Sequence, residues 1–221
     1  MSRYRLVIWR HGQTTWNSEN RFQGHADVPL NEIGIEQARE AARLLASLTP
    51  NAIISSDLSR AQDTALELAR LVGVEVRLDP RLRETDVGSW SGNTIAEIRT
   101  QDAARYAEWM DGLDVPAGGA ENRTQVADRM EQAIVDALSA LHPGALLVVV
   151  THGGAARAAI GRLLGLAVSD WPVIGGLSNC SWSLLEQVPS AMGTRWRLAE
   201  HNAGSLPMPV IGDDPAPTTA W

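Results

Sequence analysis

LLVVVTHGG, residues 146–154, is the stretch that decides the fold. Its first five residues are apolar and three consecutive ones are β-branched, which is typical of a strand buried on both faces of a parallel sheet. Thr151 and His152 follow at once, and a helical pattern then runs from about Ala155 to Leu164. The stretch therefore predicts a buried strand, a turn that carries a histidine, and a helix.

A second stretch near the N-terminus has the same form. Residues 5–9 read RLVIW, a short apolar run that predicts another buried strand, and Arg10 and His11 stand at its carboxyl end. Ligands of open parallel sheets bind outside the carboxyl ends of the strands. We therefore expect Arg10, His11 and His152 to lie at one edge of the sheet.

Helical and strand patterns alternate along the rest of the chain. Asn31 is placed to cap a helix that runs to about Leu48, and residues 59–62 fit a capping box that opens a helix ending at Gly73. Arg60 would then lie in that helix's first turn. Further helices are expected from about residue 94 and over 126–141, and strands over 52–55, 74–78, 179–185 and 194–199, the last two able to form a hairpin at the sheet edge.

This order of elements predicts an α/β protein, a three-layer α/β/α sandwich with a mostly parallel central sheet. The chain has 221 residues, of which 44% are hydrophobic, and this is enough for one domain with its own core. We expect that domain to span residues 1–203. Residues 204–221 are rich in proline and small residues, which predicts a poorly ordered tail.

Composition narrows the classes of function. No run of residues approaches the roughly 18 apolar residues of a membrane helix, and no signal-peptide pattern opens the chain, so we expect a soluble, cytoplasmic protein without a membrane partner. A net charge of -7 argues against nucleic-acid binding. The single cysteine, Cys180, cannot form an internal disulfide, and no cysteine and histidine spacing indicates a metal site.

Two arginines and two histidines are expected at the same edge: Arg10, His11, Arg60 and His152. These basic groups would repel one another in an empty site, whereas a phosphate dianion matches the bidentate geometry of arginine. The alternative, a set of separate surface salt bridges, explains their convergence less well. Glu84 lies in a turn-rich loop over residues 79–93 and adds a possible acid.

Short motifs across most of the chain resemble the histidine phosphatase (phosphoglycerate mutase-like) family. The matching segments, in order, are RHGQT (10–14), WN (16–17), RFQG (21–24), DVPL (27–30), GIEQA (34–38), SSDLSRA (55–61), LRE (82–84) and THGG (151–154). The resemblance implies the phosphoglycerate mutase-like fold and phosphoryl transfer without a cofactor or metal.

The resemblance also implies roles for particular residues. His11 would attack phosphorus to form a phosphohistidine, and Glu84 would donate a proton to the leaving group. The phosphoryl oxygens would be held by Arg10, Arg60 and His152, and the phosphate pocket would also be lined by Asn17, Gln23 and the Gly24 backbone. Gly153 opens a helix and would add the positive end of its dipole.

The residues after Glu84 separate two branches of the family. Mutases continue with Arg-His-Tyr-Gly, whereas residues 85–92 here read TDVGSWSG, which resembles the phosphatase branch. Late segments at 171–182 and 195–198, with Asn202, resemble the glucosyl-3-phosphoglycerate phosphatases of actinobacteria. The resemblance therefore implies hydrolysis of a small phosphomonoester, with glucosyl-3-phosphoglycerate converted to glucosylglycerate and phosphate as the expected reaction. A homodimer is also expected.

A substrate with a sugar and a carboxylate needs a second basic contact and an aromatic surface. Arg105, Tyr106 and Trp109 are candidates, although the two aromatic residues could equally pack in the core of a covering helix. Three alternatives stay open: a broad-specificity phosphatase, a phosphoglycerate mutase, and a non-catalytic module that binds phosphorylated ligands.

Overall fold

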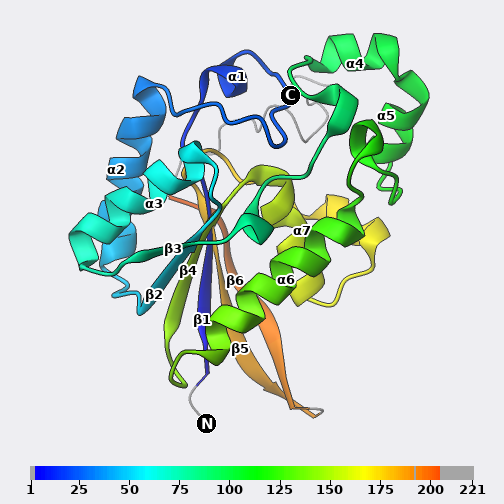
Figure 1. The fold of residues 1–221 in the computed structure, drawn as a ribbon. Coiled ribbons are helices and arrows are strands. Elements are labelled where there is room, and N and C mark those ends of the chain that lie inside the picture. Colours follow the sequence, from blue (N-terminus) through cyan, green and yellow to red (C-terminus); the bar gives the residue numbers. More distant parts are fainter. Residues whose placement is uncertain (1–2, 192, 205–221) are drawn as a thin grey trace, which may run out of the picture.

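A six-stranded sheet forms the centre of the computed structural model, which describes residues 3–191 and 193–204 (Figure 1). Its order is β3-β2-β4-β1-β5-β6, and the strands are β1 (Arg5–Arg10), β2 (Ala52–Ser55), β3 (Val76–Leu78), β4 (Leu146–Thr151), β5 (Trp182–Ser190) and β6 (Gly193–Ala203). The first four strands in this order are parallel to one another, β5 runs antiparallel to β1, and β6 runs antiparallel to β5. The predicted mostly parallel sheet and late hairpin are confirmed. The predicted tail, apart from Gly204, lies outside the described residues.

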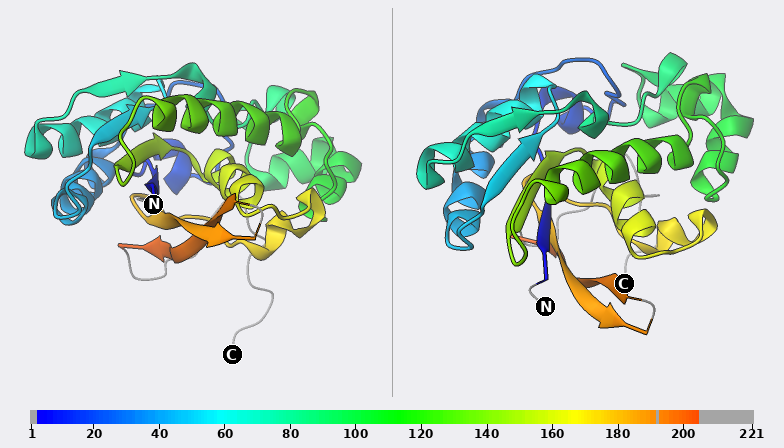
Figure 2. Two further views of the ribbon diagram at one scale, coloured as in Figure 1. Left: turned by 90° about the horizontal axis from the view of Figure 1, so that it is seen from below. Right: turned by 60° about the horizontal axis from the view of Figure 1, so that its bottom comes forward.

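Helices cover both faces of the sheet, so that the molecule has the predicted three layers (Figures 1 and 2). α2 (Glu32–Ala46) and α3 (Ser59–Val72) pack on one face, and α6 (Arg123–Ser139) and α7 (Gly153–Leu163) pack on the other. Side chains alternate along β1, so that Val7 and Trp9 pack in the core under α2 and α3. Leu6 and Ile8 pack in the core under α6 and α7. All six residues of β4 are buried, as its apolar sequence predicts.

Shorter elements gather beyond the carboxyl ends of the parallel strands. Figure 1 shows α1 (Thr15–Ser18), α4 (Ile95–Gln101) and α5 (Ala103–Met110) at the end of the molecule opposite the N-terminus. The 3₁₀ turns are η1 (Pro80–Leu82), η2 (Gly88–Trp90), η3 (Ala117–Gly119) and η4 (Val168–Val173). Phe22, Trp90, Tyr106 and Trp109 form a third core here, with ring centroids 5.8–6.3 Å apart. We call residues 87–119 the cap, and Phe22 packs against it.

Of the two helix caps predicted from the sequence, one is confirmed and one is wrong. Asn31 caps α2 by accepting a hydrogen bond from the Gly34 amide at 2.8 Å, as expected. The capping box predicted at Ser59 is wrong, because Leu58 is the N-cap of α3 and makes no side-chain cap bond. The Ser59 amide and hydroxyl both donate to Asp27 Oδ1 at 2.8 Å, so a tertiary acceptor replaces the local one.

Candidate active site

His11 and His152 follow neighbouring parallel strands. Arg10, the last residue of β1, is in register with Thr151, the last residue of β4, and the His11 amide donates to the Thr151 carbonyl at 3.0 Å. The two imidazole centroids are consequently 5.0 Å apart. The strand order thus brings together two histidines that are 141 positions apart in the sequence.

The protonation state of His11 follows from its contacts. Nδ1 lies 2.7 Å from the Gly12 carbonyl oxygen, which can only accept, so Nδ1 carries the proton and Nε2 keeps its lone pair. Burial, followed by the charges of Arg60 and Arg10, holds the pKa of His11 well below its usual value. The ring is therefore neutral at neutral pH, as a nitrogen nucleophile requires.

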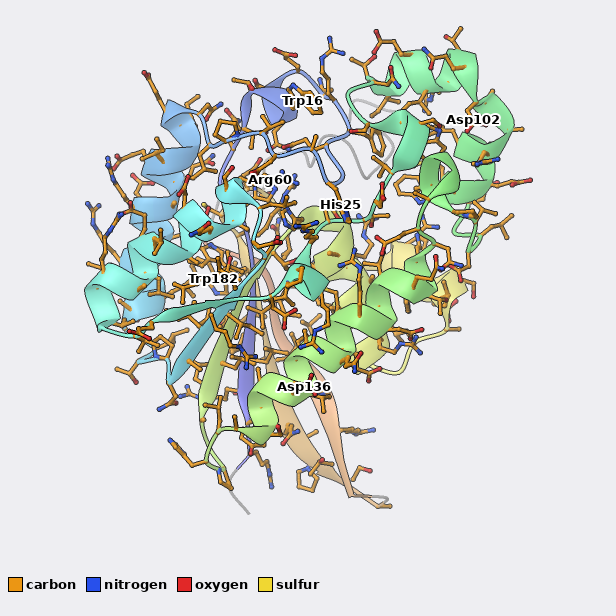
Figure 3. The ribbon with its side chains drawn as sticks, in the orientation of Figure 1. Trp16, His25, Arg60, Asp102, Asp136 and Trp182 are labelled. Carbon is orange, nitrogen blue, oxygen red and sulfur yellow. The ribbon has the colours of Figure 1, made fainter. Side chains whose placement is uncertain are left out.

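Arg60 is fully buried, and its guanidinium donates three hydrogen bonds. Its Nε donates to His152 Nδ1 at 3.2 Å, Nη1 donates to the Ala26 carbonyl at 2.7 Å, and Nη2 donates to the Gly24 carbonyl at 2.9 Å. Burial lowers the pKa of Arg60 to about 10, so the guanidinium still carries its charge at pH 7. Figure 3 shows Arg60 at the end of α3 nearest the carboxyl ends of the strands.

His152 lies behind Arg60 and is also neutral. Its Nδ1 accepts from Arg60, and its Nε2 donates to the Ser56 hydroxyl at 2.9 Å. Burial and then the charge of Arg60 hold the pKa of His152 well below its usual value. Burial therefore keeps both rings neutral and leaves the positive charge of the site on the arginines, so the repulsion expected among the four basic groups is confined to the guanidiniums.

The carboxylate of Glu84 lies on the N-terminus of α7. Oε1 accepts from the Thr85 and Ala155 amides at 2.8 and 2.9 Å, and Oε2 accepts from the Gly154 amide at 3.1 Å. The helix dipole predicted to act on phosphate therefore acts on Glu84 in this structure.

These groups surround a pocket that opens to solvent. Its lining includes seven of the predicted site residues, Arg10, His11, Asn17, Gln23, Gly24, Arg60 and Glu84, whereas His152 and Gly153 do not line it. Asn17 Oδ1 accepts from the Thr14 amide and hydroxyl, both at 3.1 Å, which fixes its amide group. Gln23 Oε1 is buried and has no hydrogen-bond partner among the described residues, as expected where a polar ligand binds.

The model of the histidine phosphatase superfamily (branch 1) matches residues 6–203. The chain belongs to this family. A glucosyl-3-phosphoglycerate phosphatase of Mycolicibacterium vanbaalenii is 40% identical to this histidine phosphatase over 214 residues, which cover 91% of this chain and 95% of the relative. A protein of Yersinia pestis named "probable phosphoglycerate mutase" is 32% identical, with coverage of 94% and 97%.

Solved structures agree with these relatives. The structure of mycobacterial glucosyl-3-phosphoglycerate phosphatase with VO3 superposes on this histidine phosphatase with a TM-score of 0.84 and 39% identity, covering 90% of this chain and 99% of that one. The phosphoglycerate mutase-like fold implied by the sequence is therefore confirmed.

A second, smaller pocket adjoins the first in this histidine phosphatase. Both are lined by Thr85, Trp109 and Gly154, and the second is also lined by Arg123 and Arg157. Trp109 is thus both a core residue of the cap and part of the pocket wall. Arg105 pairs with Asp102 at 3.7 Å, and Tyr106 is buried in the cap, so neither lines the two pockets.

Sequence reasoning found Arg10 and Arg60 but missed three further arginines that line the pockets, Arg21, Arg123 and Arg157. Arg21 lines the first pocket and donates to the Gly92 carbonyl at 2.8 Å. Arg123 is the first residue of α6, and Arg157 lies within α7. Both lie outside residues 105–109, where the second basic contact was expected. A search of helix positions one turn beyond THGG would have found Arg157.

Two further classes of feature are absent from the described part of the chain. Within residues 3–191 and 193–204, no three histidine, cysteine, aspartate or glutamate side chains are grouped as metal ligands would be. Among the same residues, no helix combines the length and apolar character needed to cross a membrane.

Proposed function

We propose that this histidine phosphatase hydrolyses a small phosphomonoester through a phosphohistidine at His11, and that its substrate is glucosyl-3-phosphoglycerate, which yields glucosylglycerate and phosphate. The observation that carries the proposal is a neutral His11 whose Nδ1 donates to the Gly12 carbonyl, in a pocket that is also lined by Arg10, Arg60 and Glu84. The names of the M. vanbaalenii relative and of the mycobacterial structure support the choice of substrate.

In the first step, His11 Nε2 attacks phosphorus and the bond from phosphorus to the ester oxygen breaks. Arg10 and Arg60 stabilise the charge on the phosphoryl oxygens in the transition state, and Asn17 and Gln23 add polar contacts. Glu84 protonates the leaving oxygen. Because Oε1 already accepts two amides and Oε2 accepts one, we assign the transferred proton to Oε2.

In the second step, water attacks the phosphohistidine. Glu84 takes a proton from that water, the bond from phosphorus to Nε2 breaks, and inorganic phosphate leaves. His152 acts through Arg60, which it orients by a hydrogen bond, and Gly153 begins the helix whose amides hold Glu84. Neither step requires a metal or an organic cofactor.

The Yersinia pestis relative supports a second candidate, a phosphoglycerate mutase. Purified protein should be assayed without added metal on glucosyl-3-phosphoglycerate, 3-phosphoglycerate and an aryl phosphate. We expect phosphate release that is fastest from glucosyl-3-phosphoglycerate. Interconversion of 3- and 2-phosphoglycerate without phosphate release would favour the mutase, and equal turnover of several sugar phosphates would favour a broad-specificity phosphatase.

We also propose that the enzyme works in the cytoplasm as a homodimer, without nucleic-acid or membrane partners. The net charge of -7 supports the lack of nucleic-acid binding, and β6, an edge strand of the sheet, offers a surface for a second copy. Cell fractionation would test the cytoplasmic location, and light scattering of the purified chain would test the homodimer.

A further inference from the structure

We propose that the second pocket binds a carboxylate of the substrate through Arg157 and Arg123. This inference rests on the proposed function, because it places the carboxylate of a phosphoglycerate ester. The pocket shares Thr85, Trp109 and Gly154 with the phosphoryl pocket, so the two lie side by side. None of its described lining residues is acidic.

Arg123 forms a fixed wall of this carboxylate pocket. Its guanidinium carbon lies 4.7 Å from the centroid of the Trp109 ring, and its Nη atoms donate to the Trp109 and Leu113 carbonyls at 2.5 and 2.9 Å. These contacts hold a positive charge against the same tryptophan that lines the phosphoryl pocket. A carboxylate here would meet a cation that is already oriented.

Arg157 also lines this pocket. It is half-buried on α7, one turn after Gly154, whose amide holds Glu84. In a 3-phosphoglycerate ester the carboxylate is separated from the phosphorylated carbon by one carbon. A substrate with its phosphate beside His11 and its leaving oxygen beside Glu84 can therefore direct the carboxylate past Gly154 toward Arg157.

The test compares two substrates in one variant. Glucosyl-3-phosphoglycerate and glucosylglycerol 3-phosphate differ only in a carboxylate replaced by CH2OH. For Arg157→Met, we expect kcat/KM on the carboxylate ester to fall at least about tenfold further than on the carboxylate-free ester. Arg162→Met is the matched control on the same helix, since Arg162 pairs with Asp128 and Glu131 and lines neither pocket.

An unchanged ratio of the two kcat/KM values in Arg157→Met would overturn the carboxylate pocket. A wild-type protein that hydrolyses neither ester would instead overturn the proposed function. Because both substrates are measured in the same sample, partial misfolding of the variant cancels in the ratio.

A separate observation carries a second inference: we propose that Arg129 and Glu121 are positioning residues for Glu84. Arg129, on α6, donates to the carbonyls of Arg81, Arg83 and Glu84 at 2.8, 2.6 and 2.8 Å. It also makes a two-point ion pair with Glu121 at 2.8 and 2.9 Å. The Arg129 side chain is only 17% exposed, so this pair is shielded from water.

Glu121 fixes the backbone on the C-terminal side of Glu84. Its Oε2 accepts from the Asp86 amide at 2.8 Å, and the Glu121 amide donates to the Asp86 carbonyl at 3.1 Å. His25 Nε2 donates to the Glu84 carbonyl at 2.9 Å. The backbone before and after Glu84 is therefore held by Arg129 of α6 and by Glu121, which lies just before α6. Since proton transfer needs hydrogen-bond reach, loosening this backbone should weaken the acid step selectively.

The dependence on leaving group tests this inference. An alkoxide needs a proton as it leaves, whereas p-nitrophenolate leaves as an anion. For Arg129→Gln we expect kcat/KM, which reports the step up to loss of the leaving group, to fall at least about tenfold further on glucosyl-3-phosphoglycerate than on p-nitrophenyl phosphate. Arg129→Lys should behave similarly because one ammonium cannot reach all four partners. Glu84→Gln should show the same bias more strongly. Arg197→Gln, which removes an exposed pair with Glu186, should change neither rate.

Equal losses on both substrates in Arg129→Gln, together with a clear bias in Glu84→Gln, would overturn the positioning role. Equal losses in Glu84→Gln would instead overturn the acid role on which this inference rests.

Discussion

At the scale of single residues, the buried hydroxyl of Ser56 completes a chain that runs through His152 to Arg60. Ser56→Ala would leave the buried Nε2 proton of His152 without its acceptor. We expect a loss of about 1–3 kcal/mol in the free energy of unfolding, measured by urea denaturation. Ser47→Ala, which removes an exposed hydroxyl, is the control. A Ser56→Ala variant as stable as the wild type would show that the ring is satisfied in another way.

Residues close to a strong motif could be assigned from the sequence, and distant ones could not. Arg10, His11 and Glu84 lie in segments whose pattern and resemblance mark them directly. Arg123 and Arg157 line a common pocket with Trp109 of the cap, and the Arg123 guanidinium lies over that ring. Nothing in the local sequence of either arginine indicates this proximity, whereas Arg105, which lies in the expected region, pairs with Asp102 instead.

At the scale of elements, the N-terminus of α2 packs directly against the loop after His11. A Cβ built on Gly34 would lie 2.0 Å from the Gln13 carbonyl oxygen, which is backbone and cannot rotate away. Gly34→Ala should therefore destabilise the fold by about 1–3 kcal/mol and lower kcat, because residues 12–13 follow the nucleophile. Thermal unfolding and steady-state rates measure the two effects.

Gly175→Ala is the matched control for Gly34→Ala. A Cβ there would meet nothing nearer than His201 Nε2 at 3.9 Å. If Gly34→Ala were as stable and as active as Gly175→Ala, the close approach of α2 to the loop after His11 would be wrong.

Long apolar or periodic elements were predictable, and elements defined by tertiary contacts were not. Hydrophobic runs and periodicity in the sequence predict β1, β4, α2 and α6 to within a few residues at their ends. α5 and the 3₁₀ turns of the cap depend on packing of Trp90 and Trp109, which no short period reveals. The strand expected from Asn179 begins only at Trp182, because Cys180 has a φ of 58° and lies in a turn.

At the scale of the whole molecule, the two buried neutral histidines couple stability to pH. In the unfolded chain His11 and His152 would take up protons near pH 6.5, but their lowered pKa values keep them neutral in the folded protein. Below pH 6.5 the unfolded chain binds more protons. The free energy of unfolding should therefore fall on acidification by up to about 1.4 kcal/mol per pH unit for each histidine, and this loss should be absent above pH 6.5.

Urea denaturation at pH 7.5, 6.5 and 5.5 measures this slope. The His11→Asn variant lacks one of the two groups, so its stability should depend less steeply on pH than that of the wild type. A wild-type stability that is constant from pH 7.5 to 5.5 would mean that these rings do not stay neutral in the fold.

The central claim is that His11 carries the phosphoryl group during turnover. Wild-type enzyme should be mixed with an excess of ³²P-labelled substrate, quenched in alkali within one turnover and analysed for protein-bound label that is stable to alkali and labile to acid. We predict such label at His11 in the wild type, and in His11→Ala we predict no label and at least about a thousandfold slower phosphate release. Full phosphate release by His11→Ala would contradict the account.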